Sequence, residues 1–192
     1  FGKSSHASQP ENGHNPARAI SKLIIDIPEL TAREDHRGIV MATVVCVRIG
    51  EEAFGTNAGF GQLMLTIRAE FESELDALDA EICARARAYA RQDGITNVEV
   101  QYRDSFPETR NTPDAVAAVR KARLECELPE ARWDEPFRSS EDFGCYTKLT
   151  SGALFYIGCG TRHAKLHTRE YDFNDEIIEP AVDMMFRLAQ DA

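Results

Sequence analysis

The sequence predicts a mixed α/β (α+β) chain, in which a split βαβ, ferredoxin-like domain with a four-stranded antiparallel sheet precedes part of a larger α/β domain. Two observations carry this prediction. Strand-like and helix-like patterns follow the order β-α-β-β-α-β up to residue 104, which is typical of one sheet with two helices on one face. After residue 104 a single short strand pattern remains, too little to close a sheet. We therefore expect one domain over 1–104 and a second, incomplete part over 105–192.

The first predicted elements are a short strand and a helix. Residues 1–8 are expected to close the first strand. Asn15-Pro16 should begin the helix, because Asn caps free amide groups and Pro suits the first turn. Pro28 should end the helix, since proline cannot continue its hydrogen bonding. Apolar residues between them have the i, i+3, i+4, i+7 spacing of one buried helix face: Ile20, Leu23, Ile24 and Ile27.

Two strands and a second helix follow. Residues 39–49 are rich in β-branched side chains, which favour a strand. In residues 62–71 apolar and more polar side chains alternate, and this places Arg68 on the less apolar face of a half-buried strand. Ser73 is expected to cap the second helix, and Gly94 to end it.

The last strand of the sheet is predicted by the alternation of Val98, Val100 and Tyr102 with charged and polar residues. The composition then changes to that of a linker. The elements expected after it are a linker at 105–113, helices that begin at Thr112-Pro113 and at Ser139, one short buried strand at 153–159 and a last helix. Because of Pro180, this last helix either starts near Glu179 or has a kinked first turn.

The composition excludes several classes of protein. With 43% hydrophobic and 28% charged residues, the chain has the balance of a soluble globular protein. Its net charge of −10 argues against nucleic acid as a partner, and no run of about eighteen apolar residues predicts a membrane span. Five scattered cysteines without a C-x-x-C pair fit reduced thiols in the cytoplasm. The chain starts at Phe1 without a methionine or a signal-peptide pattern, so we expect a piece of a longer protein.

His163 and His167 are the histidines whose position most favours a functional role. They follow a strand pattern that ends at Gly158 and Gly160, and α/β proteins often place ligands and metals in loops after strand ends. From spacing alone, a structural and a metal-binding histidine both remain open. His36 is expected to be a solvated loop residue. The sequence has no G-x-S-x-G, phosphate-loop or dinucleotide motif and no convincing set of three or four metal ligands.

Four motifs resemble the M20 family of metallopeptidases and amidohydrolases, in that family's order. Gly2-Lys-Ser-Ser-His6-Ala-Ser-Gln-Pro10, followed by Gly13-His-Asn-Pro16, resembles the start of the lid domain in the branch that hydrolyses N-acyl amino acids. The motifs that resemble later parts of the family are the T-x-R strand at 66–68, the S-E-D-F segment at 140–143 and the final G-x-G…H…Y-x-x-N-D segment at 158–175. The resemblance implies a lid and dimerisation domain at 1–104 and the C-terminal portion of a zinc-peptidase-like catalytic domain at 105–192.

The resemblance also implies roles for four residues. His167 matches the last metal ligand of the catalytic domain, and Arg68 matches a lid arginine that holds the substrate carboxylate. His6 matches a lid histidine that reaches the partner subunit's active site and donates a hydrogen bond to the oxyanion. Asn57 lies near the place of the family's N-x-I-P motif, but no proline follows it and the spacing is shorter. A substrate contact and a simple turn residue therefore both remain open for Asn57.

The implied function is hydrolysis of the amide bond of N-acyl amino acids or small peptides by a homodimeric enzyme with two zinc or manganese ions. In the family a metal-bound water attacks the carbonyl, and a glutamate that lies outside this chain is the general base. Most of the family's metal ligands precede the lid, so we expect the chain alone to be inactive. The alternative is a non-catalytic dimerisation or small-ligand-binding module, because split βαβ domains often serve that way.

Overall fold

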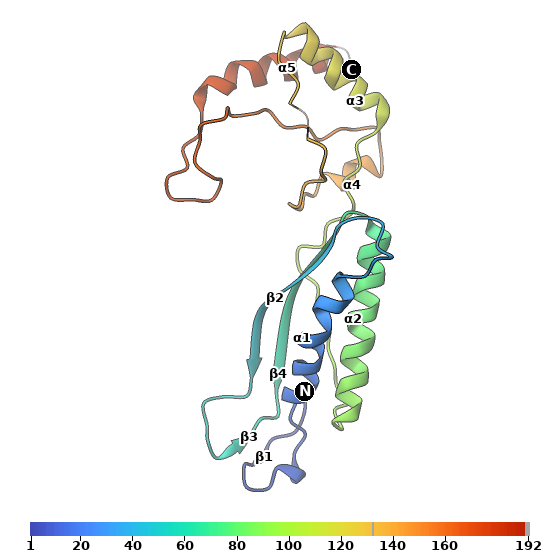
Figure 1. Ribbon diagram of the computed structural model, residues 1–192, viewed down its shortest axis with the longest axis vertical. Coiled ribbons are helices and arrows are strands. Elements are labelled where there is room, and N and C mark those ends of the chain that lie inside the picture. The colour runs from blue at the N-terminus through green and yellow to red at the C-terminus, as the bar shows by residue number, and fades with distance from the viewer. Residues whose placement is uncertain (132, 191–192) are drawn as a thin grey trace. The chain divides into compact units, whose positions relative to one another are not determined.

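The computed structural model describes residues 1–131 and 133–190, and its contacts divide the chain into two compact units, Phe1–Ser105 and Phe106–Ala192 (Figure 1). The elements of the first unit are β1 (Ser5–His6), the 3₁₀ turn η1 (Pro10–Asn12), α1 (Ala17–Thr31), β2 (Val40–Ile49), β3 (Thr56–Asn57), β4 (Gly61–Ala69) and α2 (Glu72–Gln92). β2 pairs antiparallel with β4, and β1 pairs antiparallel with β3.

The core of the first unit lies between the β2–β4 pair and the two helices. Leu63, Leu65 and Ile67 of β4 pack against a buried cluster that includes Leu23 of α1 and Ile82 of α2. Both helices therefore cover the same face of the pair, as the sequence pattern predicts. Because side chains alternate along a strand, Arg68, which is paired with Met41, lies on the opposite face.

The mixed α/β class is confirmed, but the sheet differs from the four-stranded form expected from the sequence. The first unit has two separate two-stranded pairs, and residues 98–103 belong to neither. The Tyr102 hydroxyl donates to Asp79 Oδ2 of α2 at 2.7 Å, so this segment is held against a helix. β3 lies between the strands expected at 39–49 and 62–71, and it was not predicted because two paired residues leave no periodic signal.

Both helices of the first unit have ends that differ from the prediction. α1 starts just after Asn15-Pro16, and the Asn15 side chain accepts from the Ala17 amide at 2.8 Å, but the helix continues through Pro28 to Thr31. Burial of Leu30, which is 3% exposed, holds this last turn in place. Ser73 does not cap α2, which begins at Glu72; its hydroxyl instead accepts from Arg37 Nη2 at 2.6 Å.

The second unit consists of helices and long connecting loops in the part that the structure describes. Its elements are α3 (Pro113–Glu125), α4 (Gly144–Thr147), the 3₁₀ turn η2 (Asp175–Ile177) and α5 (Ile178–Gln190). α3 starts at the predicted Thr112-Pro113, and α5 accommodates Pro180 in its first turn. The short helix starts at Gly144 rather than at Ser139.

The strand expected at 153–159 is not formed. The backbone of Leu154 pairs with a side chain: its amide donates to Asn111 Oδ1 at 2.9 Å, and its carbonyl accepts from Asn111 Nδ2 at 2.9 Å. An amide side chain offers both a donor group and an acceptor, as the backbone of a neighbouring strand would, but it cannot extend a ladder. The interpretation of the two units as a lid and part of a catalytic domain stays a prediction.

Candidate functional site

The His6 loop joins β1 to η1 and holds the histidine ring in a defined orientation. The Ser8 backbone amide donates to His6 Nδ1 at 3.1 Å, and Ser8 Oγ lies 2.7 Å from the same nitrogen. A backbone amide can only donate, so Nδ1 acts as an acceptor and the neutral ring carries its proton on Nε2. The side chain is exposed, and the donor Nε2–H is therefore available to a ligand.

Asn57 lies at the centre of a hydrogen-bond network beside this loop. In the register of β1 and β3, Asn57 is opposite Ser5 and Thr56 is opposite His6. Asn57 Nδ2 donates to Ser5 Oγ at 3.0 Å, and Asn57 Oδ1 accepts from Asn15 Nδ2 at 2.8 Å. The Asn15 side chain also accepts from the Ala17 amide at the start of α1, so Asn57 joins the His6 strand to the start of that helix. This is a positioning role in strand β3; a substrate contact stays a prediction.

Arg68 is half-buried near the end of β4, on the face that points away from the helices. It lies seven residues after Gly61, where β4 begins, which corresponds to roughly 20 Å along a strand. β1 and β3 lie beyond the Gly61 end of β4 (Figure 1). The structure therefore brings His6 and Asn57 together and places Arg68 far from both within one copy of the chain.

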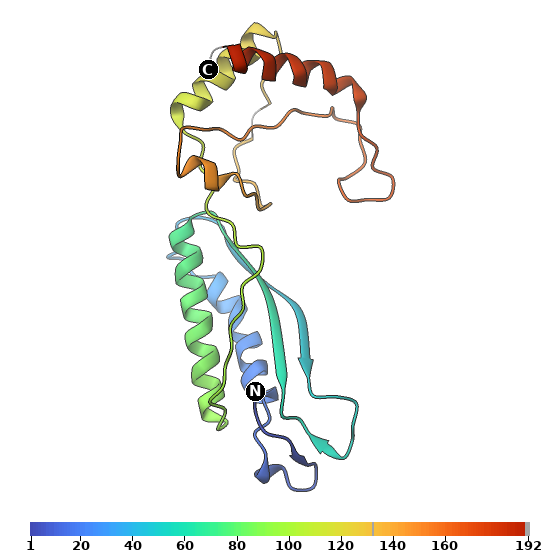
Figure 2. The same ribbon diagram turned by 180° about the vertical axis from the view of Figure 1, so that it is seen from behind.

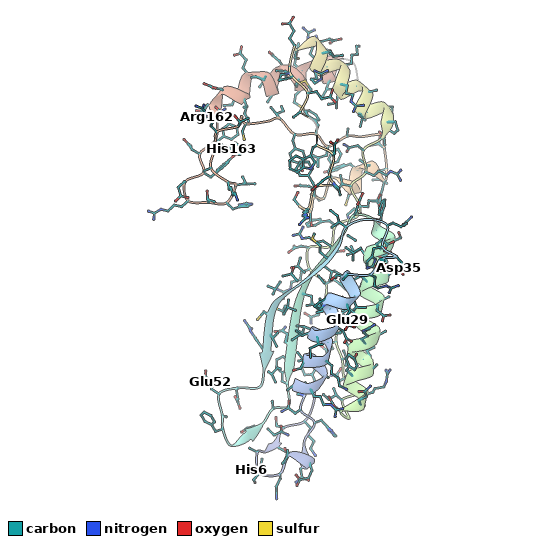
Figure 3. All side chains as sticks on the ribbon, viewed as in Figure 1. His6, Glu29, Asp35, Glu52, Arg162 and His163 are labelled. Carbon is teal, nitrogen blue, oxygen red and sulfur yellow. The ribbon has the colours of Figure 1, made fainter. Side chains whose placement is uncertain are left out.

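His167 lies in an exposed loop of the second unit and has a left-handed backbone with φ of 65°. The neighbouring His163 is engaged locally, with Nδ1 2.9 Å from the Ala164 carbonyl oxygen. Figure 3 shows His163 beside Arg162, and both line a shallow hollow of about 450 Å³ together with Glu170 and Asp172. Within residues 1–131 and 133–190, no three His, Cys, Asp or Glu side chains are grouped closely enough to hold a metal ion.

His36 is a residue that the sequence reading misjudged. Its ring is mostly buried rather than solvated, with Nε2 2.9 Å from the Leu30 carbonyl oxygen and Nδ1 2.8 Å from Glu74 Oε2. Only a doubly protonated ring can donate to both groups, so the Leu30 carbonyl and the Glu74 carboxylate raise the pKa of His36. The partners lie 38 residues apart, and no local pattern predicts such a contact.

Comparisons with known proteins give a consistent class of relative, although no family model matches the sequence. The chain is 23% identical over 196 residues to hippurate hydrolase of Campylobacter jejuni, with 98% of this chain and 49% of the relative covered. It is 26% identical over 192 residues to N-acetyldiaminopimelate deacetylase of Bacillus licheniformis, with 96% and 49% covered. The crystal structure of a Staphylococcus aureus tripeptidase matches with a TM-score of 0.73 and 16% identity, over 98% of this chain and 48% of that one.

These comparisons confirm the resemblance inferred from the motifs. The chain is related to hydrolases that act on amide bonds, and it has the fold of part of a larger hydrolase. It spans about half the length of the curated relatives it matches. Within the described residues, no helix is both long and apolar enough to cross a bilayer.

Proposed function

We propose that the chain is one half of a metal-dependent amidohydrolase of the M20 type, which cleaves the amide bond of N-acyl amino acids or small peptides. The relatives act on hippurate and on N-acetyldiaminopimelate, and a structural neighbour is a tripeptidase. The observation that carries the proposal is the fixed orientation of His6, whose Nδ1 accepts from the Ser8 amide. The cytoplasm, with all five cysteines reduced, is the proposed location.

His6 would act as a hydrogen-bond donor to the oxygen of the scissile amide. Attack on an amide carbonyl moves negative charge onto that oxygen, and a donor already in place stabilises the charge without reorganising. In the neutral ring Nδ1 accepts from the Ser8 amide, so Nε2–H is the donor that His6 offers. Asn57 supports this role indirectly, because it anchors the adjacent Ser5 to the start of α1.

Arg68 would hold the substrate carboxylate through its planar guanidinium group. A small N-acyl amino acid cannot reach both His6 and Arg68 of one copy, because they lie at opposite ends of β4. A homodimer through the lid unit, with His6 of one subunit completing the site of the other, resolves this conflict. Two-fold dimers present the same surface twice, so both sites would be completed equally.

The metal ions of the proposed enzyme need ligands beyond those of this chain. Among the described residues, His167 has no neighbouring ligands that could close a coordination shell, and a metal site requires three or four. His167 is proposed as a single ligand to zinc or manganese. The other ligands would belong to the half of the relatives that this chain does not cover.

A non-catalytic dimerisation or small-ligand-binding module is the second candidate. It is favoured by a different observation, namely that the described residues bring no group of three metal-binding side chains together. The two candidates differ in what a complete polypeptide does, because a binding module hydrolyses nothing with or without added metal.

The test compares the isolated chain with the complete enzyme that contains it. We expect the complete enzyme to release amino acids from N-acetyl and N-benzoyl substrates in a way that chelator abolishes and zinc or manganese restores. The isolated chain should be inactive and should take up zinc only weakly, because one imidazole cannot fix a closed site. Tight stoichiometric zinc binding by the isolated chain, or a complete polypeptide that leaves every acyl substrate intact, contradicts the proposal.

A further inference from the structure

Phe54 lies in the connection between β2 and β3, and its side chain is fully exposed. Among the residues that the structure describes, no other large apolar side chain is more exposed. The phenyl ring therefore adds no packing to the unit, and its burial against another molecule would be favourable. Single exposed apolar residues are common on protein surfaces, so what Phe54 can do depends on where the backbone holds it.

Backbone hydrogen bonds fix the turn that carries Phe54. The Thr56 amide donates to the Ala53 carbonyl oxygen at 3.0 Å and closes a four-residue turn. Phe54 and Gly55 are its two central residues, and the Ala53 amide donates in turn to the Glu51 carbonyl oxygen at 2.8 Å. A Cβ placed on Gly55 would meet no atom within 4 Å, so the tip of the turn projects away from the rest of the unit. The exposure of Phe54 is therefore a property of a hydrogen-bonded turn.

The same turn is joined to the loop that holds His6. Thr56 pairs with His6 in the register of β1 and β3, and the Ala7 amide donates to the Gly55 carbonyl oxygen at 2.9 Å. β1 and β3 lie side by side at one end of the unit in both views (Figure 1 and Figure 2). Two residues of chain and one strand spacing separate Phe54 from His6, so their Cα atoms are at most about 13 Å apart. Side chains and one substrate group can bridge this distance.

We propose that Phe54 packs against the acyl group of the substrate and favours large, apolar acyl groups over acetyl. This inference rests on the proposed function, in which His6 donates to the oxygen of the scissile carbonyl. That carbonyl carbon carries two substituents, the amide nitrogen of the amino acid and the acyl group. The amino acid is held through its carboxylate by Arg68 of the partner subunit, so the acyl group is the substituent left for side chains that accompany His6. Phe54 is the large apolar side chain at the tip of the turn that is joined to the His6 loop.

The charge of the connection favours an acyl group without a carboxylate of its own. Glu51 and Glu52 precede Phe54 and are both exposed, and Figure 3 shows Glu52 at the same end of the first unit as His6. No basic residue lies within 50–55 to offset these two charges. Like charges repel, so an acyl group that carries a negative charge is disfavoured beside the turn. Phe54 and its neighbours therefore fit aromatic or medium-chain acyl groups better than a succinyl group.

The experiment measures kcat/KM of the complete enzyme for the N-acetyl, N-benzoyl, N-octanoyl and N-succinyl derivatives of one amino acid. We expect Phe54→Ala to lower kcat/KM by about tenfold or more for the benzoyl and octanoyl substrates, because an apolar contact of this size discriminates to that extent. The value for the acetyl substrate should stay within about twofold, and so should the Tm-derived stability, since the side chain is exposed. Phe54→Leu keeps an apolar side chain and should retain most of the preference. Ile25→Ala, which removes an exposed apolar side chain of α1, is the matched control and should leave all four values unchanged.

Several results overturn the inference while leaving the hydrolase intact. One is a native enzyme that prefers the acetyl or succinyl substrate, and another is a Phe54→Ala enzyme whose relative rates for the four substrates equal those of the native enzyme. A change that follows the amino acid rather than the acyl group, when a second amino acid is tested, places Phe54 at the wrong end of the substrate. Loss of the dimer in light scattering on Phe54→Ala assigns the ring to a subunit contact instead. A complete polypeptide that hydrolyses none of the four substrates contradicts the proposed function itself, and the inference with it.

Discussion

The side-chain amide of Asn15 donates to Asn57 Oδ1 at 2.8 Å, across 42 residues of sequence. Through this bond the start of α1 is tied to β3, and the Asn57 amide in turn holds Ser5, next to His6. The orientation of the proposed oxyanion donor therefore depends on a network that lies behind it. Such a network positions a functional side chain without touching substrate.

Replacement of Asn57 by Ala should destabilise the chain by about 1–3 kcal/mol, because it leaves the Asn15 amide and the Ser5 hydroxyl without their partner. Asn57→Asp keeps the acceptor but loses the donor to Ser5, so its effect should be smaller. Urea unfolding measures both, with Asn97→Ala, an exposed asparagine, as the control. Equal stability of Asn57→Ala and Asn97→Ala would show that the network has no structural role.

His36 should make stability depend on pH. The raised pKa of His36 means that its contribution is complete below its unfolded value of 6.5 and is lost as pH rises through the folded pKa. The lowered pKa of Glu74 means that its contribution is present above 4.5 and is lost as pH falls. The difference in Tm between the native chain and His36→Gln should therefore be largest near about pH 5.5 and smaller near about pH 8.

The control for this prediction is His163→Gln, since His163 is an exposed histidine of the other unit. Its Tm difference from the native chain should change little between the two pH values. A His36→Gln difference that grows as pH rises would contradict the assignment of a protonated ring between Leu30 and Glu74.

How much of the fold the sequence predicts depends on the range of the interaction. Asn15-Pro16 predicts the start of α1, and the alternation around Arg68 predicts its face, because both signals lie within a few residues. The contact of His36 with Glu74 and the attachment of Tyr102 to α2 join distant residues, which no local pattern records. His6 was selected by resemblance, but the reason for its orientation became visible only with the Ser8 contact.

Arg68→Ala in the complete enzyme should lower kcat/KM by roughly thirty- to a thousand-fold, through loss of a charged hydrogen bond to the substrate carboxylate. The loss should shrink for a substrate with an amidated carboxylate, because Arg68 then has no charge to bind. Arg48→Ala is the matched control, since Arg48 lies on the same face at the other end of the β2–β4 pair. An equal loss for both substrates would indicate that Arg68 acts on folding rather than on substrate binding.

The cross-subunit position of His6 can be tested by complementation. Subunits with His6→Ala and subunits inactivated at the metal site should each be inactive, and their mixture should recover part of the activity, because a mixed dimer retains one complete site. Subunit exchange is checked independently with tagged chains. A mixture that exchanges subunits and remains inactive would assign His6 to its own subunit or to a structural role.

The most direct test of the account is the kcat of His6→Ala in the complete enzyme, measured with the carboxylate substrate and with its amidated form. An oxyanion donor acts in the transition state, so kcat should fall by about a hundredfold or more for both substrates while KM changes little. The Tm should stay near that of the native enzyme, because His6 is exposed. A His6→Ala enzyme that keeps its kcat, or loses activity only through a higher KM, would contradict the central claim that this chain contributes the oxyanion donor of an amidohydrolase.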